Sequence, residues 1–175
     1  MTFEDCLNYL LEEEGGWSNH PSDRGGATFN GVTQTTYDDW RTRIKKLPKQ
    51  SVRYAKSDEI KELYEVMYWR AASCDTLPSP FNYLAFDAAV NSGPSRSVHW
   101  LQEGLGVAQD GKVGPQTRGA AQKAVESGDA SKILAVVQAR ADFLVDLVRG
   151  NQSQLAFLKG WWRRTLRVLG RALAS

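Results

Sequence analysis

The chain alternates between stretches with apolar residues at three- and four-residue intervals and short polar stretches rich in glycine and proline. Such spacing is typical of amphipathic helices, and paired turn residues are typical of the connections between them. The pattern predicts helices at about residues 2–14, 33–43, 57–69, 81–92, 94–105, 115–127, 131–149 and 153–174. No strand longer than a few residues is predicted. We therefore expect an all-α fold with at most a small β-hairpin near residues 17–33.

Composition fits a small folded protein. The 175 residues are 42% hydrophobic and 24% charged, which excludes a disordered chain and a large multidomain protein. The net charge of +2 gives no electrostatic reason to expect a nucleic-acid partner. No apolar run is long enough to cross a membrane, and the N-terminus is acidic where a secretory signal would be basic. We expect no signal peptide and no transmembrane segment.

Charge is distributed unevenly along the chain. Residues 1–40 contain eight acids and one base, whereas residues 147–175 contain six bases and no acid. In the C-terminal helix, an apolar stripe runs beside a basic face: the stripe is Leu155, Leu158, Trp162, Leu166 and Leu169, and the basic face is Lys159, Arg163, Arg167 and Arg171, extended by Arg164. One interpretation is that the stripe packs on the body of the protein. The other is that the helix contacts an anionic membrane, wall or lipopolysaccharide. Both hold if the basic face stays exposed.

Cysteine and histidine suggest no metal centre. Cys6 and Cys74 are too few for a disulfide framework and lack metal-ligand spacing, although a single disulfide between them remains open. His20 and His99 have no ligand motif beside them. We therefore expect no metal site.

Three consecutive glutamates end the first predicted helix. A helical wheel places Glu14 within the apolar stripe of that helix, with Glu13 about 100° away and Glu12 nearly opposite. Burial and the negative end of the helix dipole both raise the pKa of a carboxyl group in the position of Glu14. A raised pKa suits a general acid near neutral pH. The competing interpretation is a solvated helix end without chemistry.

Two further polar residues follow in the turn-rich stretch after Glu14. Asp23 lies nine residues on, across a loop that can bring two carboxyl groups to one cleft, and Thr28 follows five residues later. A carboxylic acid paired with a carboxylate is the apparatus of glycoside hydrolysis, and a hydroxyl can position water. Equally, Asp23 can be a turn-capping residue with no catalytic part.

Spaced motifs along the chain add a resemblance. They are Glu14-Gly15-Gly16-Trp17, then Asn19, Pro21, Asp23, Gly25-Gly26, Thr28 and Gly31-Val32-Thr33, followed by residues 86–93 (FDAAVNSG), Trp100-Leu101-Gln102, Asp110-Gly111, Val113-Gly114-Pro115 and Thr117. The first set closely resembles the glycoside hydrolase family 108 lysozymes, which are phage-type N-acetylmuramidases. The second set is similar to the peptidoglycan-binding segment that accompanies them.

This resemblance implies a lysozyme-like fold that cleaves the β-1,4 bond between N-acetylmuramic acid and N-acetylglucosamine without a cofactor. It implies that Glu14 is the principal catalytic acid, with Asp23 and Thr28 as helpers by analogy with phage lysozymes of the T4 type. The sequence departs from the family at Ala27, where members commonly have an acid, so more of the chemistry falls on Asp23.

Five residues are candidates for binding the sugar: Trp17, Asn30, Tyr68, Asp87 and Asn91. Asp87 and Asn91 are four residues apart on an otherwise apolar helix, so they share one face. They either line the sugar groove or brace neighbouring backbone. Aromatic residues at helical spacing, including Tyr64 and Trp69, are either sugar platforms or core residues.

The resemblance also suggests the organisation and biological setting. We expect a catalytic region at residues 1–93 and a helical peptidoglycan-binding region at residues 94–175, packed together in a monomer. A phage endolysin of this kind would stay in the host cytoplasm until a holin opened the membrane. Two alternatives remain: a lytic transglycosylase, whose products would carry an anhydro end, and a virion protein that binds the wall without catalysis.

Overall fold

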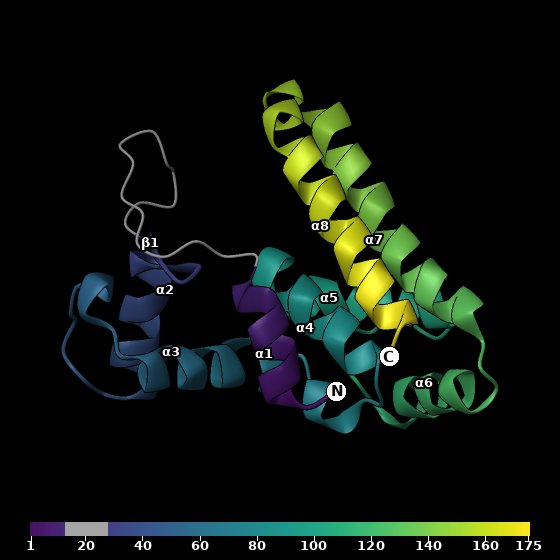
Figure 1. Ribbon diagram of the computed structural model, residues 1–175, viewed down its shortest axis with the longest axis horizontal. Helices are drawn as coiled ribbons and strands as arrows, with labels where there is room; N and C mark the ends of the chain where they lie inside the picture. The colour runs from purple at the N-terminus through teal and green to yellow at the C-terminus, as the bar shows by residue number, and fades with distance from the viewer. Residues whose placement is uncertain (13–27) are drawn as a thin grey trace. The chain divides into compact units, whose positions relative to one another are not determined.

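The computed structural model describes residues 1–12 and 28–175 (Figure 1). These residues form eight α-helices and one two-stranded antiparallel hairpin, which confirms the expected mainly α fold. They divide into two compact units, an N-terminal unit of Thr2–Met67 and a C-terminal unit of Tyr68–Ser175 with Met1. The first three helices and the hairpin belong to the N-terminal unit, and the other five helices belong to the C-terminal unit.

The N-terminal unit begins with helix α1, Phe3–Leu11. Thr2 caps this helix, because its hydroxyl accepts a hydrogen bond from the backbone N–H of Asp5 while the Asp5 carboxylate accepts one from the backbone N–H of Thr2. This reciprocal capping satisfies two of the amide groups that a helix start leaves without partners. The apolar face predicted from the sequence is buried, and Leu7 and Leu10 belong to it. The last two residues of the predicted helix, 13 and 14, lie outside the described residues.

A short hairpin follows, with strand β1 at Thr28–Phe29 and strand β2 at Val32–Thr33. Thr28 pairs with Thr33, and Phe29 pairs with Val32. The connecting residues Asn30 and Gly31 have φ angles of 46° and 76°. Positive φ at both central positions is the backbone of a type I′ turn, for which Asn-Gly is a preferred sequence. The predicted hairpin is thus confirmed within the described residues.

Two helices complete the N-terminal unit, and each differs from its prediction. Helix α2, Gln34–Asp39, continues as a π-helical turn at Trp40–Ile44, and helix α3, Ser57–Tyr64, continues as a π-helical segment at Glu65–Arg70. A short 3-10 turn, Val52–Tyr54, lies between them. A π-turn bonds residues five apart instead of four. Over a single turn, the apolar pattern cannot distinguish these spacings, so the sequence predicted uninterrupted α-helices.

The C-terminal unit is built around helix α4, Phe81–Ser92, in which every residue from Phe81 to Ala89 is buried. Helices α5 (Pro94–Leu105), α7 (Ala130–Gly150) and α8 (Leu155–Leu173) pack against it. Figure 1 shows α7 and α8 side by side and antiparallel. Helix α6 (Pro115–Glu126) and 3-10 turns at Cys74–Thr76 and Gln152–Gln154 complete the unit. An α4 that is apolar on nearly all sides is therefore the central helix, as the sequence predicted.

None of the helices within residues 1–12 and 28–175 combines the length and the apolar composition that crossing a bilayer requires.

Helices α5 and α7 approach each other closely at Gly104. A Cβ atom added at this residue would lie 2.3 Å from the backbone nitrogen of Val136 and 2.5 Å from its Cα. Both atoms belong to the backbone of α7, so no rotation of a side chain can relieve the overlap. The contact between the two helices therefore depends on the absence of a side chain at this position.

Replacement of Gly104 by Ala is expected to lower the free energy of unfolding by about 1–3 kcal/mol, the usual cost of overpacking. Urea denaturation of the full chain measures this change. Gly119→Ala is the matched control, because Gly119 lies on exposed α6 with nothing within 4 Å of an added Cβ. Alanine favours a helix over glycine by about 0.5–1 kcal/mol, so this control should be slightly stabilising. Equal stability of the two variants would contradict the close approach.

Candidate functional site

Three of the predicted site residues, Glu14, Trp17 and Asp23, lie outside the described residues. The segment that contains them follows Glu12, the C-cap of α1, and ends before Thr28 in β1. Both flanking elements belong to the N-terminal unit. The structure therefore shows how the two ends of the candidate catalytic segment are held.

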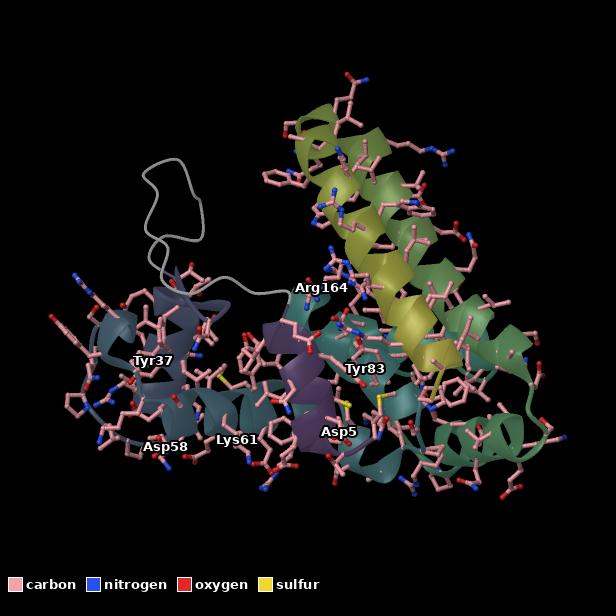
Figure 2. All side chains as sticks on the ribbon, in the orientation of Figure 1. Asp5, Tyr37, Asp58, Lys61, Tyr83 and Arg164 are labelled. Carbon is pink, nitrogen blue, oxygen red and sulfur yellow. The ribbon has the colours of Figure 1, made fainter. Side chains whose placement is uncertain are left out.

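Helix α3 contacts both flanking elements. Lys61 on α3 forms an ion pair with Glu4 on α1, with 2.7 Å between Nζ and Oε1 (Figure 2). Tyr64, also on α3, is only 1% exposed, and its hydroxyl donates a hydrogen bond of 2.8 Å to the backbone carbonyl of Asn30. The exposed ion pair contributes little to stability, whereas the part-buried hydrogen bond fixes the hairpin turn to the helix.

A buried polar cluster fixes α2 to α3. The Arg41 guanidinium lies 3.0 Å from Oε1 of Glu59, and the Tyr37 hydroxyl donates to Oε2 of the same carboxylate at 2.9 Å. Burial and the hydrogen bond to Glu59 raise the pKa of Tyr37, so it remains a neutral donor across the physiological range. Since α2 directly follows β2, this cluster also restrains the base of the hairpin.

Two predicted site residues lie in that hairpin. Thr28 is half-buried in β1, and Asn30 occupies the left-handed turn position whose carbonyl binds Tyr64. A catalytic or sugar-binding role for either side chain stays a prediction. What the structure adds is that the backbone carrying both is held by two independent contacts, and a rigid scaffold is what a positioning residue needs.

The aromatic candidates separate into core and surface. Tyr64 is 1% exposed, and Trp69 is 6% exposed and packs edge-to-face on Phe86 with 5.5 Å between ring centroids. Both are therefore core residues. Tyr68 is half-buried, so it remains a candidate for sugar contact.

Asp87, predicted either to line the sugar groove or to brace the fold, is 1% exposed and lies among three helices. Its Oδ2 accepts a hydrogen bond of 2.6 Å from Arg140 on α7, and its Oδ1 accepts one of 3.0 Å from Nε of Arg164 on α8. Burial raises the pKa of this carboxyl group, but the two guanidinium charges outweigh burial, and the pKa is held below its usual value. Both oxygens are occupied, which favours the bracing role.

Arg164 differs from its prediction. The sequence placed it on the outer basic face of the last helix, but its side chain is only 13% exposed and forms an ion pair with Asp87; Arg164 is labelled in Figure 2. The sequence pattern missed this ion pair because its two members are 77 residues apart.

The apolar stripe of α8 packs on the body only in part. The residues that α8 buries fully are Thr165, Val168 and Ala172. On the wheel, this buried face lies roughly 90° from the centre of the predicted stripe. Leu158 and Leu169 are half-buried, whereas Leu155, Trp162 and Leu166 of the stripe are 60%, 49% and 51% exposed. Beside them, Lys159, Arg163 and Arg167 are exposed, so an apolar stripe and a basic face lie together on the surface of α8.

Gln102 explains much of the second sequence motif. Its side chain is 1% exposed and donates to Oδ1 of Asp110 at 2.7 Å and to the hydroxyl of Thr117 at 3.2 Å. Its carbonyl oxygen accepts the backbone N–H of Gly111 at 2.9 Å. The hydrogen bond from Gln102 lowers the pKa of Asp110, and one from the backbone N–H of Lys112 lowers it further. The motif residues thus hold the loop between α5 and α6 and are not an open binding site.

Both cysteines are fully buried, Cys6 in the N-terminal unit and Cys74 in the C-terminal unit. Burial raises the pKa of Cys6 to about 12, so its thiol is protonated and unreactive at neutral pH.

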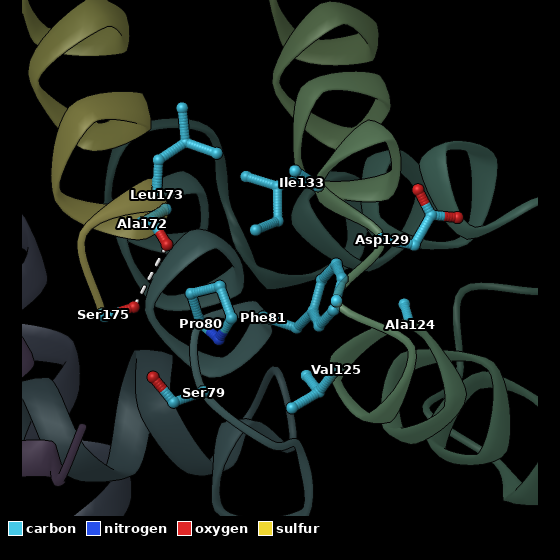
Figure 3. A pocket seen from close by; sticks show the side chains of 12 residues that line it. Ser79, Pro80, Phe81, Ala124, Val125, Asp129, Ile133, Ala172, Leu173 and Ser175 are labelled. Atoms are coloured by element: carbon cyan, nitrogen blue, oxygen red, sulfur yellow. Dashed lines mark hydrogen bonds between the residues drawn. The ribbon is translucent and has the colours of Figure 1, made fainter.

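Within residues 1–12 and 28–175, no cluster brings together three histidine, cysteine or acidic side chains suited to a metal ion. One pocket of about 230 Å³ in the C-terminal unit is lined mainly by apolar side chains, including Phe81, Val125 and Ile133 (Figure 3). Its one carboxylate, Asp129, caps the start of α7 by accepting from the backbone N–H of Ser131. This pocket lacks the paired groups that glycoside cleavage requires.

Comparisons with known proteins cover almost the whole chain. Residues 7–93 match the family model described as Glycosyl hydrolase 108, and residues 96–166 match the one described as Predicted Peptidoglycan domain. Twelve chains of solved structures match significantly. One of them, Brucella abortus SagA, is 32% identical with a TM-score of 0.82, over 98% of this chain and 94% of that chain. No curated protein matches significantly.

Replacement of Asp87 by Asn is expected to lower the free energy of unfolding by about 3–5 kcal/mol, because it leaves two inward-facing guanidinium groups without their counter-charge. The matched control is Asp146→Asn, which breaks an exposed ion pair with Arg149 and should cost under about 1 kcal/mol. Chemical denaturation at pH 7 measures both.

The same pair of proteins should respond differently to acid. Because the pKa of Asp87 is lowered in the folded state, its contribution is complete above the unfolded value of about 3.9 and is lost as pH falls through the folded value. The stability gap between the native chain and Asp87→Asn should therefore narrow below about pH 4. A gap that stayed constant down to pH 2 would contradict the ion-pair assignment.

Proposed function

Since the chain belongs to the glycosyl hydrolase 108 family and is a peptidoglycan hydrolase, we propose that it cleaves the β-1,4 bond between N-acetylmuramic acid and N-acetylglucosamine. The observation that carries this proposal is the order Glu14-Gly15-Gly16-Trp17, Asp23 and Thr28 within the matched residues 7–93. It places a glutamic acid, an aspartate and a hydroxyl in the sequence order of a muramidase.

In the proposed reaction, Glu14 donates a proton to the oxygen of the leaving sugar. Asp23 supports the positive charge that develops on the other sugar, and Thr28 orients the attacking water. The held ends of the segment support this division of labour: α1 leads to Glu14, and the hairpin fixed by Tyr64 carries Thr28. Trp17, Asn30 and Tyr68 are proposed to contact the sugars, and Asn91 is proposed to contact another part of the same substrate.

The domain assignment is part of the proposal. Residues 1–93 would form the catalytic region and residues 94–175 the peptidoglycan-binding region, in agreement with the ranges of the two family models. The boundary between the two compact units lies elsewhere in the sequence, between Met67 and Tyr68, because α4 packs with α5, α7 and α8. The proposed catalytic region therefore includes α4, which belongs to the C-terminal unit.

The biological role that we propose is that of a phage endolysin, acting as a monomer and released from the host cytoplasm by a holin. The resemblance of the first motif to phage-type muramidases supports it. The surface of α8 supports a second contact, with an anionic membrane or lipopolysaccharide, because exposed apolar and basic side chains lie there together.

Glu14→Gln is expected to abolish nearly all hydrolysis while the protein stays folded, because the amide keeps the shape of the acid but cannot donate its proton. Release of reducing ends from purified peptidoglycan measures the rate, and mass spectrometry of the products separates hydrolysis from transglycosylation. Glu13→Gln is the matched control and should be mild. If both variants were equally inactive, the helical wheel would have selected the wrong glutamate.

Asp23→Asn should slow the same reaction by at least about 10²-fold, the usual loss for a catalytic carboxylate. Turnover near that of the native chain would reassign Asp23 to the turn. A native chain that bound peptidoglycan without cleaving it would favour the non-catalytic wall-binding alternative.

For α8, the double change Lys159→Gln and Arg163→Gln should weaken binding to vesicles that contain anionic lipid. The loss should be greatest at low salt, since salt already screens exposed charges. Arg118→Gln with Lys123→Gln on α6 is the matched control and should have no effect. Arg164 is left unchanged because it pairs with Asp87. Binding that both double variants retained at every salt concentration would leave α8 without a membrane role.

A further inference from the structure

A groove of about 200 Å³ opens on the C-terminal unit where four helices meet. Asn91 and Ser92 line it from the end of α4, and Arg96 lines it from the first turn of α5. Phe143 and Leu147 line it from α7, and Trp161 lines it from the second turn of α8. It lies apart from the apolar pocket of Figure 3 and shares no lining residue with it. Unlike that pocket, it is polar at one end and aromatic along its side.

At the polar end, Arg96 has a charge that no acid neutralises within the described residues. Its guanidinium lies 4.5 Å from the centroid of the Phe143 ring, and Nη1 donates a hydrogen bond of 3.3 Å to the carbonyl of Ser92. Both contacts orient the guanidinium, and neither supplies a negative charge. A guanidinium held over an aromatic ring keeps N–H groups available for a carboxylate.

Asn91 adds neutral hydrogen-bonding capacity beside Arg96. The side chain is exposed, and one amide hydrogen is used in a bond of 2.7 Å to the carbonyl of Asp87. The second amide hydrogen and the side-chain oxygen remain to bind a peptide or amide group. The groove therefore offers a cation and an amide at the same end.

The side of the groove is apolar. Phe143 and Leu147 are partly buried on α7, and Trp161 is partly buried on α8, where it stacks on Phe157 with 5.9 Å between centroids. Its neighbour Trp162 faces away from the groove and belongs to the exposed stripe of α8. Adjacent tryptophans thus serve two different surfaces, and each provides a control for the other.

Charge selects the ligand. Among residues 1–12 and 28–175, the only charged side chains that line the groove are Arg96 and Arg140, and Arg140 is already paired with Asp87. The glycan strand of peptidoglycan is uncharged where the lactyl group of muramic acid is amide-linked to peptide, whereas the stem peptide carries free carboxylates. We propose that this groove binds the acidic stem peptide of peptidoglycan, with Arg96 pairing with a carboxylate, Asn91 with the peptide backbone, and Trp161 and Phe143 packing on its aliphatic parts.

This proposal rests on the proposed function, because it names the part of peptidoglycan that the C-terminal unit recognises. It assigns recognition to residues outside the Gln102 motif, whose polar groups are occupied by the loop that they hold. It also gives the enzyme a reason to distinguish peptide-bearing glycan from bare glycan. The groove would contribute to substrate affinity and not to bond cleavage.

Titration of the full chain with a synthetic acidic stem tetrapeptide, followed by calorimetry, tests the groove directly. Arg96→Gln and, separately, Trp161→Ala should each weaken binding by about tenfold or more, the expected loss for a charge-assisted contact or a central aromatic contact. Arg149→Gln and Trp162→Ala are the matched controls and should bind within about twofold of the native chain. Amidation of the peptide carboxylates should remove the dependence on Arg96.

Kinetics separate this inference from the proposed function. On intact peptidoglycan, Arg96→Gln should raise KM while kcat stays unchanged, and on peptidoglycan whose stem-peptide carboxylates have been amidated it should behave as the native chain does. Peptide binding that does not depend on Arg96, with hydrolysis intact, would overturn the groove and leave the enzyme assignment standing. Arg96-dependent binding without any hydrolysis would overturn the enzyme assignment and leave the groove standing.

Discussion

The C-terminal unit depends on one buried carboxylate. Asp87 on α4 binds Arg140 of α7 and Arg164 of α8, so a single negative charge joins three helices. An ion pair of this kind adds little net stability over apolar packing, but it tolerates only one arrangement of its members. Here it sets the rotation of α8 about its axis. With this rotation, Trp161 lines the groove, and Leu155, Trp162 and Leu166 of the apolar stripe are exposed.

Local features of the fold could be predicted from the sequence because local interactions determine them. Apolar spacing located the helices, and the turn residues after Gly25-Gly26 indicated a small hairpin, whose Asn30-Gly31 turn was itself a readable signal. The rotation of α8 could not be predicted in this way. A helical wheel assumes that the most apolar face is buried, whereas the face actually buried is set by Arg164 and its distant partner.

The candidate site shows a similar division. The order Glu14, Asp23, Thr28, which we propose to be catalytic, is visible in the sequence, and the family match covers those positions. The contacts that hold the segment, such as Tyr64 with Asn30 and Arg41 with Glu59, join residues far apart in the chain. Arg96 had no sequence signal, since an exposed arginine at a helix start is common. Only its position over Phe143 distinguishes it.

Burial of the two cysteines limits their reaction with oxidants and disulfides. Cys6 and Cys74 are both fully buried, and the thiol of Cys6 ionises only near its raised pKa of about 12. Thiolates, and not thiols, react with oxidants and disulfides. At neutral pH the Cys6 thiol is therefore shielded from oxidants and from disulfide exchange twice, by burial and by its proton, and unfolding of the N-terminal unit removes both protections together.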